Sequence, residues 1–308
     1  MSPFKTNKLL PVDRRLKTAL SFYGLDTDTK LLRNYDNLVY QVKAEQVYAL
    51  KIYSPTINYQ RLISTVEWLS ALRRDTDLLV PKPVPNNRGN LISQIEDRYC
   101  VLFEWLNGEP VSRSMSSEVA RKIGEIIAKL HLHAVNYRPN NYTGDRFDYN
   151  YFFGSASWWQ AEAKERLQNN YESLIPAIEK AKGLISSMEE SPEQFGMIHS
   201  DLHFSNVISN KEQYAVIDFG ECGMGYYLMD IAVTESEFED YKSADELIAA
   251  FRAGYRDYRS FPNYDVETFK VISSLLLLEW IFESESDRVR QDKIRWVPEI
   301  VETMTKAI

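Results

Sequence analysis

Cysteine is scarce in this chain of 308 residues, which contains only Cys100 and Cys222. Two cysteines so far apart indicate neither a disulfide framework nor a zinc site. The N-terminal residues have no apolar segment of the kind found in signal peptides. The most hydrophobic run, residues 273–282, is too short to span a bilayer and contains Glu279. We therefore expect a cytoplasmic protein.

Positive charge is also in short supply, because 36 Lys and Arg face 44 Asp and Glu, for a net charge of −8. This balance argues against nucleic acid and anionic membranes as partners, and it tolerates cationic small molecules. The hydrophobic content of 44% is enough to bury one large core or two lobes. Composition leaves the oligomeric state open.

The most informative stretch runs from residue 197 to residue 231. Two short apolar runs, residues 207–209 and 214–217, flank a polar turn and predict a β-hairpin that ends at Asp218. Such a hairpin can bring Asp201, Asn206 and Asp218 together. Phosphoryl transfer needs a carboxylate to accept the acceptor proton, and oxygen ligands to hold Mg²⁺. Either half of the pattern is also consistent with an ordinary turn, but the joint pattern favours phosphoryl transfer.

The segments HSDLHFSN (residues 199–206) and VIDFGECGMGYYLMDIAV (residues 216–233) resemble the signature of the aminoglycoside phosphotransferase and choline kinase superfamily. That family usually has Gly at the position of Ser200. The resemblance implies an α+β, protein-kinase-like fold with two lobes. A small N-terminal lobe with an antiparallel sheet would span residues 1–104, and a mainly helical C-terminal lobe would span residues 105–308.

The same resemblance implies an ATP- and Mg²⁺-dependent kinase that moves the γ-phosphoryl group to the hydroxyl of a small molecule. Asp201 would orient and deprotonate the acceptor, and Asn206 and Asp218 would ligate Mg²⁺. His199 and Asp230 would support the catalytic loop.

Nucleotide binding is expected to involve Lys51, which ends an alternating apolar run and resembles the kinase lysine that binds the α and β phosphates. A lysine on an edge strand is the alternative. The loop at residues 34–37 has no glycine; the stretch from residue 35 to residue 42 looks like a segment of the stress-response kinase A group. Residues 103–108 resemble the linker between lobes, whose backbone at Phe103 and Trp105 would contact adenine.

A helix is predicted over residues 59–73, with its apolar residues on one face. Glu67 is the candidate partner for the ammonium group of Lys51. The register of the apolar face, however, places the family's glutamate at Thr65. Because two residues correspond to about 200° around a helix, Glu67 would then point away from Lys51.

Two features bear on the acceptor. Residues 137–159 are rich in aromatic side chains that could line a pocket for an amine, or form a second hydrophobic cluster. Acidic runs at residues 235–240 and 279–287 could bind amino groups, or form solvated helix faces. Amino alcohols, aminoglycosides, homoserine-like compounds and sugars all suit the family. A Ser/Thr protein kinase of the stress-response type and a nucleotide-binding pseudokinase are the alternative functions.

Overall fold

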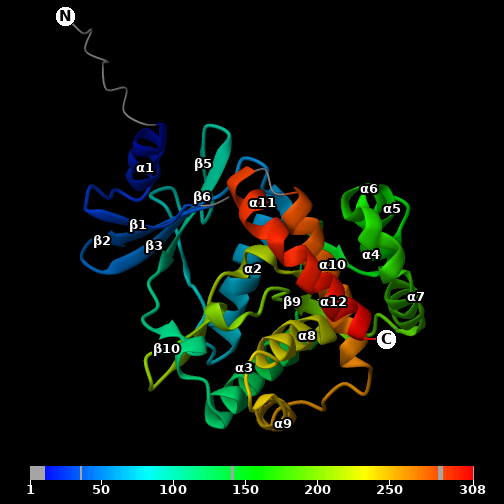
Figure 1. Ribbon diagram of the computed structural model, residues 1–308. Coiled ribbons are helices and arrows are strands. Elements are labelled where there is room, and N and C mark those ends of the chain that lie inside the picture. The colour runs from blue at the N-terminus through cyan, green and yellow to red at the C-terminus, as the bar shows by residue number, and fades with distance from the viewer. Residues whose placement is uncertain (1–10, 35–36, 140–141, 284–286, 308) are drawn as a thin grey trace, which may run out of the picture. The chain divides into compact units, whose positions relative to one another are not determined.

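The computed structural model describes residues 11–34, 37–139, 142–283 and 287–307 (Figure 1). Packing divides the chain into two units, of which the first comprises Met1–Ile57 and Pro81–Trp105. The second unit comprises Asn58–Val80 and Leu106–Ile308. The boundary predicted after residue 104 lies close to the end of the first unit, whereas residues 58–80, predicted in the N-terminal lobe, belong to the second unit.

The first unit is built on an antiparallel sheet with the strand order β1–β2–β3–β6–β4, and β5 also pairs with β6. Its elements are α1 (Pro11–Ser21), β1 (Thr29–Asn34), β2 (Leu38–Lys43), β3 (Val47–Ile52), β4 (Pro83–Val84), β5 (Ser93–Ile95) and β6 (Arg98–Glu104). Alternate residues of β2 and β3, such as Val42 and Leu50, pack with Ala19 and Leu20 of α1 to form the core. Tyr35 and Asp36 of the predicted polar loop lie outside the described residues.

The second unit is mainly helical, so the α+β fold class is confirmed. Its longer helices are α2 (Tyr59–Asp75), α3 (Ser117–Asn136), α7 (Tyr171–Ser187), α8 (Tyr227–Phe238), α9 (Ala244–Arg256), α10 (Val266–Glu283) and α12 (Val297–Lys306), and its shorter ones are α4 (Tyr149–Phe153), α5 (Trp158–Ala161), α6 (Ala163–Leu167) and α11 (Asp287–Lys293). Within the described ranges, none of the helices is long and apolar enough to cross a membrane.

Two three-stranded sheets complete the second unit. One has the order β11–β10–β7, and the other has the order β8–β12–β9. Their strands are β7 (Glu109–Pro110), β8 (Arg146–Phe147), β9 (Phe195–Ile198), β10 (Val207–Ser209), β11 (Tyr214–Val216) and β12 (Gly223–Tyr226). The loops that leave β9 and β11 carry the predicted catalytic and metal-binding residues.

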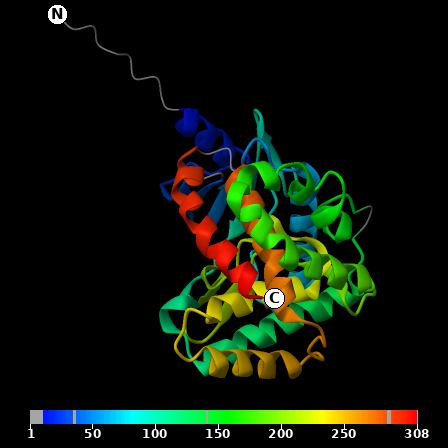
Figure 2. The same ribbon diagram turned by 45° about the vertical axis from the view of Figure 1, so that its right-hand side comes forward.

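Helices α3 and α9 lie side by side, as Figures 1 and 2 both show. Two glycines make this contact possible. A Cβ atom added at Gly124 would lie 2.0 Å from the carbonyl oxygen of Phe251, and one at Gly254 would lie 2.0 Å from that of Arg121. Only glycine therefore allows the two helix backbones to approach so closely.

The aromatic stretch predicted at residues 137–159 is mainly structural. Five of its rings are buried in the second unit: Phe147, Phe152, Phe153, Trp158 and Trp159. Two short helices, α4 and α5, carry four of these rings, and Phe147 lies in β8. The hydrophobic-cluster alternative holds for these five residues, while Tyr151 has a polar contact described below.

Candidate active site

The catalytic loop follows β9 and is anchored by Asp230 of α8. The Asp230 carboxylate, which is fully buried, accepts the backbone N–H of His199 at 3.0 Å and that of Ser200 at 2.7 Å. Ser200 has φ of +63°, in the left-handed region that is costly for a side chain with a Cβ atom. This conformation explains why glycine is common at that position in the resembled family. Asp230 has the supporting position that the sequence predicts for it.

The predicted hairpin is present, and it brings Asp218 close to the catalytic loop. Strand β10 pairs antiparallel with β11, with Val207 opposite Val216. The N–H of Ile217 donates to the carbonyl of Asn206 at 2.8 Å, and the imidazole Nε2 of His199 lies 3.0 Å from the carbonyl of Ile217. Asp218 follows with φ of +64°. Because Asp tolerates the left-handed conformation better than most residues, the chain can turn sharply here.

Asp201 and Asn206 are hydrogen-bonded to each other. The Nδ2 amide of Asn206 donates to the backbone carbonyl of Asp201 at 2.8 Å and to its carboxylate at 3.0 Å. Both amide hydrogens are thus used within the loop. The Oδ1 atom of Asn206 is then the atom suited to a metal ion.

The donor set fits a hard cation, because Asn206 and Asp218 both provide oxygen ligands. Among the described residues, no group of three or more His, Cys, Asp and Glu side chains is arranged to hold a metal ion. Magnesium in phosphoryl-transfer enzymes takes only one or two protein carboxylates and completes its shell with phosphate oxygens and water. Asn206 and Asp218 would therefore hold Mg²⁺ together with a nucleotide.

Two residues beside Asp201, His203 and Glu237, were not among the predicted site residues. The Nε2 atom of His203 lies 3.0 Å from the Asp201 carboxylate, and its Nδ1 atom lies 3.2 Å from the Glu237 carboxylate. Burial lowers the pKa of His203, but the hydrogen bonds to Asp201 and Glu237 outweigh burial and raise this pKa to about 10. His203 is therefore an imidazolium between two carboxylates at neutral pH.

The protonated state of His203 predicts a pH-dependent stability. An unfolded histidine has a pKa of about 6.5, so the stabilisation by His203 is complete below that pH and is lost as the pH rises through about 10. We expect the free energy of unfolding to fall between pH 7 and pH 10 by less in His203→Gln than in the wild type. Urea unfolding without nucleotide, and with EDTA to remove metal, measures this difference.

The matched control is His133→Gln, because burial lowers the pKa of His133 and removes it from this pH window. An equal loss of stability with pH in the wild type and in His203→Gln would contradict the assignment of His203 as a cation.

The acidic run at residues 235–240 is only partly a solvated face, because Glu239 and Asp240 are exposed whereas Glu235 and Glu237 are not. Glu235 is fully buried, and its carboxylate accepts Nε of Arg252 at 2.7 Å and Nη2 at 2.6 Å. Glu237 pairs with His203 as described, and Glu239 pairs with Lys270 of α10. These three glutamates therefore form ion pairs that join α8 to the catalytic loop, α9 and α10. The spacing of residues along α8 does not predict these partners.

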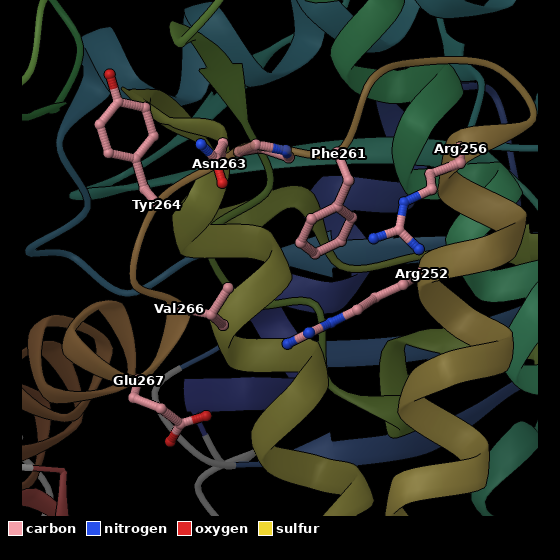
Figure 3. A pocket seen from close by; sticks show the side chains of 8 residues that line it. Arg252, Arg256, Phe261, Asn263, Tyr264, Val266 and Glu267 are labelled. Atoms are coloured by element: carbon pink, nitrogen blue, oxygen red, sulfur yellow. The ribbon is translucent and has the colours of Figure 1, made fainter.

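A separate pocket of about 490 Å³ lies where α9 is followed by the loop to α10 (Figure 3). Arg252 and Arg256, one turn apart on α9, lie over the ring of Phe261 at 5.1 and 5.2 Å from its centroid. Arg252 also binds Glu235. The basic groups of this pocket therefore hold α9 and the following loop in place, and no predicted site residue lines it.

Lys51 lies in the interior of the first unit's sheet, because β3 is flanked by β2 and β6. Its register partners are Val39 and Val101, so the edge-strand alternative is wrong. The ammonium group of Lys51 lies 5.1 Å from the ring centroid of Tyr53. Pairing with strands on both sides fixes the backbone of Lys51, and phosphate binding by its side chain stays a prediction.

Phe103 and Trp105 lie at the end of the same unit. Phe103 is nearly buried in β6, opposite Ala49 and Pro83. The backbone N–H of Trp105 donates to the carbonyl of Val47 at 3.2 Å. Contact of the Phe103 and Trp105 backbone with adenine stays a prediction.

Thr65, and not Glu67, faces the turn after Asp218. The Thr65 hydroxyl lies 3.3 Å from the carbonyl of Phe219 and 3.3 Å from Sγ of Cys222. Glu67 is exposed, and burial of the Tyr137 phenol, with a smaller contribution from the charge of Glu67, raises the pKa of Tyr137 to about 12. An ion pair between Glu67 and Lys51 stays a prediction.

Three carboxylates, Asp145, Glu221 and Glu279, lie around Tyr151 and Arg61; we call the three the acidic cluster. Arg61 of α2 donates to both Asp145 and Glu221. The Tyr151 hydroxyl lies 3.4 Å from the Glu279 carboxylate. Burial, with a contribution from the neighbouring charge of Glu283, raises the pKa of Glu279 to about 7.

The acidic cluster is joined to the catalytic loop. The hydroxyl of Ser200, which precedes Asp201, donates to the backbone carbonyl of Glu221 at 2.6 Å. Glu279 comes from α10, far along the chain from Asp145 and Glu221. The acidic run predicted at residues 279–287 had suggested a role for Glu279, whereas only packing brings it near the other two.

Comparison with known proteins supports the interpretation of this chain as a kinase. Residues 28–265 match the phosphotransferase enzyme family. Amicoumacin kinase of Bacillus subtilis is 24% identical over 240 residues, which cover 73% of this chain and 68% of that protein. The structure of a microcompartment-associated aminopropanol kinase is 25% identical, covers 95% of both chains and has a TM-score of 0.80.

A solved amicoumacin kinase in complex with AMP-PNP and Ca²⁺ is similar in fold, with a TM-score of 0.77, 17% identity, and coverage of 96% of this chain and 95% of that chain. The family match spans most of the chain and contains both the catalytic loop and the Asp218 turn. This chain therefore belongs to the phosphotransferase enzyme family and is a kinase with the protein-kinase-like fold.

Proposed function

We propose that this kinase transfers the γ-phosphoryl group of ATP to a hydroxyl group of a small amino alcohol. The acidic cluster would select the acceptor. Arg61 binds two of its carboxylates, Asp145 and Glu221, while the third, Glu279, lies against the Tyr151 hydroxyl, and the cluster adjoins the catalytic loop. A cationic amine would complete the charge balance there. The names of two similar proteins, an aminopropanol kinase and amicoumacin kinase, support an acceptor that carries an amino group.

Asp201 would orient the acceptor hydroxyl and accept its proton. Its carboxylate is held from two sides, by Asn206 at 3.0 Å and by His203 at 3.0 Å, so the plane of the carboxylate is defined. Asn206 and Asp218 would hold Mg²⁺, which neutralises charge on the phosphate oxygens. Lys51 would bind the α and β phosphates. The complex of a similar kinase with AMP-PNP and Ca²⁺ supports a nucleotide bound with a divalent cation.

The choice between an amine-bearing acceptor and a neutral one can be tested with matched compounds. We expect 1-amino-2-propanol to give a kcat/KM at least about tenfold above that of 1,2-propanediol, because one charge-assisted hydrogen bond contributes about 1.5–3 kcal/mol. ADP formation with Mg²⁺ and ATP measures both. Choline, homoserine and aminoglycosides extend the panel.

Equal rates with the amine and the diol would contradict the amino-alcohol proposal but leave a kinase. A thermal-shift titration separates the remaining alternative, since a ligand that binds the native state raises its melting temperature. Failure of Mg²⁺ and ATP to raise it would favour a non-catalytic protein, and phosphorylation of a protein substrate alone would favour the stress-response type.

The raised pKa of Glu279 predicts how acceptor binding depends on pH. Since this pKa is about 7, the ionised fraction of Glu279 grows between pH 6 and pH 8, and an ammonium group prefers the ionised form. The KM for an amino alcohol should therefore fall as the pH rises through about 7. Glu279→Gln should raise KM about tenfold at pH 8 and abolish this pH dependence.

The control is Glu302→Gln, which replaces an exposed carboxylate on α12. A Glu279→Gln variant with the pH profile of the wild type would exclude Glu279 from acceptor binding.

A further inference from the structure

A chain of buried hydrogen bonds runs from helix α9 to the catalytic loop. His131 of α3 is fully buried, and its Nε2 atom lies 3.1 Å from the Asp230 carboxylate. Its Nδ1 atom lies 3.0 Å from the hydroxyl of Tyr255, which is also fully buried. Nη1 of Arg259 donates to the same Tyr255 hydroxyl at 2.9 Å.

The direction of each hydrogen bond in this chain follows by elimination. The Asp230 carboxylate is an acceptor, because it already accepts two backbone N–H groups. Nε2 of His131 must therefore donate to Asp230. Burial lowers the pKa of His131, so the ring is neutral and carries one N–H only.

Nδ1 of His131 is then an acceptor, and the Tyr255 hydroxyl must donate to it. The oxygen of Tyr255 in turn accepts from Arg259, which can only donate. Arg259 also donates to the carbonyl of Glu193, and its guanidinium lies 4.4 Å from the ring centroid of Tyr227. Arg259 is thereby held in one orientation.

The packing of α9 keeps Tyr255 within reach of His131. The neighbouring residue Gly254 lies in the close crossing with α3, the helix that carries His131. One turn earlier, Arg252 joins α9 to α8 through Glu235, on the face shown in Figure 3. α9 is thus fixed to both helices that provide His131 and Asp230.

We propose that Tyr255 and Arg259 are positioning residues for phosphoryl transfer. They hold His131 as a neutral ring with its N–H directed at Asp230, and Asp230 in turn holds the backbone of the loop that carries Asp201. The proposal rests on the kinase activity of the family and is independent of the acceptor proposed above.

Loss of the Tyr255 hydroxyl would leave the buried Nδ1 lone pair without its donor. Such a group is costly, and the imidazole would relieve the cost by rotating or by binding a second proton. Rotation would take the donor away from Asp230, and a second proton would place a charged imidazolium beside the Asp230 carboxylate and alter the hydrogen bond between them. A small displacement of the Asp201 carboxylate is enough to slow a reaction that depends on near-attack geometry.

The test compares Tyr255→Phe with Tyr226→Phe, which removes a hydroxyl from another buried tyrosine outside the chain of hydrogen bonds. Two-bond ¹H–¹⁵N NMR spectra of histidine report the protonation of each ring nitrogen, and the chain has only four histidines. We expect an unprotonated, hydrogen-bonded Nδ1 for His131 in the wild type and in Tyr226→Phe. In Tyr255→Phe this Nδ1 resonance should move to that of a protonated or unbonded nitrogen.

Turnover of ATP with Mg²⁺ provides the second measurement, with water or the best acceptor of the panel as phosphoryl acceptor. Tyr255→Phe should lower kcat about tenfold, as replacement of outer partners typically does, and leave the KM for ATP within about twofold. Arg259→Met should act in the same direction with a smaller effect, and it serves as the deciding variant if Tyr255→Phe does not fold.

A His131 spectrum identical to the wild type, or a kcat equal to that of Tyr226→Phe, would overturn the proposal. Failure of the amino-alcohol proposal would show only in the acceptor panel, and it would leave the NMR result and the turnover of ATP in water unchanged.

Discussion

Asp201→Asn should reduce phosphoryl transfer about 10³-fold while binding of ATP with Mg²⁺ is retained. General-base catalysis by a positioned side chain contributes factors of this order, and an amide cannot accept the acceptor's proton. The substitution also places an amide N–H₂ group where Asp201 now accepts hydrogen bonds from both Asn206 and His203. Steady-state kinetics should therefore show a loss in kcat with little change in the KM for ATP.

Asp240→Asn provides the control, because Asp240 is an exposed carboxylate near the end of α8. This variant should keep the wild-type rate. A rate for Asp201→Asn within about tenfold of the wild type would remove Asp201 from the role of base, and loss of the ATP-induced thermal shift would indicate that the loop had collapsed.

Gly254→Ala should destabilise the protein by about 3 kcal/mol, the largest effect on stability expected here. The added Cβ would lie 2.0 Å from the carbonyl oxygen of Arg121, a backbone atom that cannot move without separating α9 from α3. Urea unfolding, followed by circular dichroism, measures the loss. Because Tyr255 adjoins Gly254, the same variant should also lower kcat.

Gly183→Ala is the matched control within a helix. A Cβ at Gly183 of α7 meets no atom within 4 Å among the described residues, so the change should be neutral or stabilise by up to about 1 kcal/mol. Equal stability of Gly254→Ala and Gly183→Ala would mean that α3 and α9 can separate at little cost, which would also weaken the argument for Tyr255.

The parts of the site that could be predicted from the sequence are local. Asp201, Asn206 and Asp218 lie within 18 residues of one another, and the alternation of apolar residues with a polar turn specifies the hairpin that joins them. The alternation of residues 47–53 likewise predicts the strand that carries Lys51, whose proposed role comes from the resemblance to the kinase lysine. The structure adds that this strand is interior.

Contacts between distant residues could not be predicted, because local periodicity carries no information about them. Glu237 is 34 residues from His203, and Tyr255 is 124 residues from His131. The acidic run at residues 235–240 has the composition of a solvated face, yet its Glu235 is fully buried and forms an ion pair with Arg252. The sequence shows which side chains are charged, but the tertiary packing determines which of them form ion pairs.

By itself, the sequence determined the hairpin that joins Asn206 to Asp218, because the apolar and polar pattern is local. The kinase family and the α+β fold followed from the resemblance of two short segments to a known signature. The helical register also indicated that Thr65 takes the position expected for Glu67, and the contact of Thr65 with the Asp218 turn agrees with it. Tertiary structure alone decided that His203 lies between two carboxylates that raise its pKa, and that Glu279 joins the acidic cluster. The physical reason is that burial and the close approach of α3, α8, α9 and α10 set the environment of each charged group, and these depend on residues far apart in the chain.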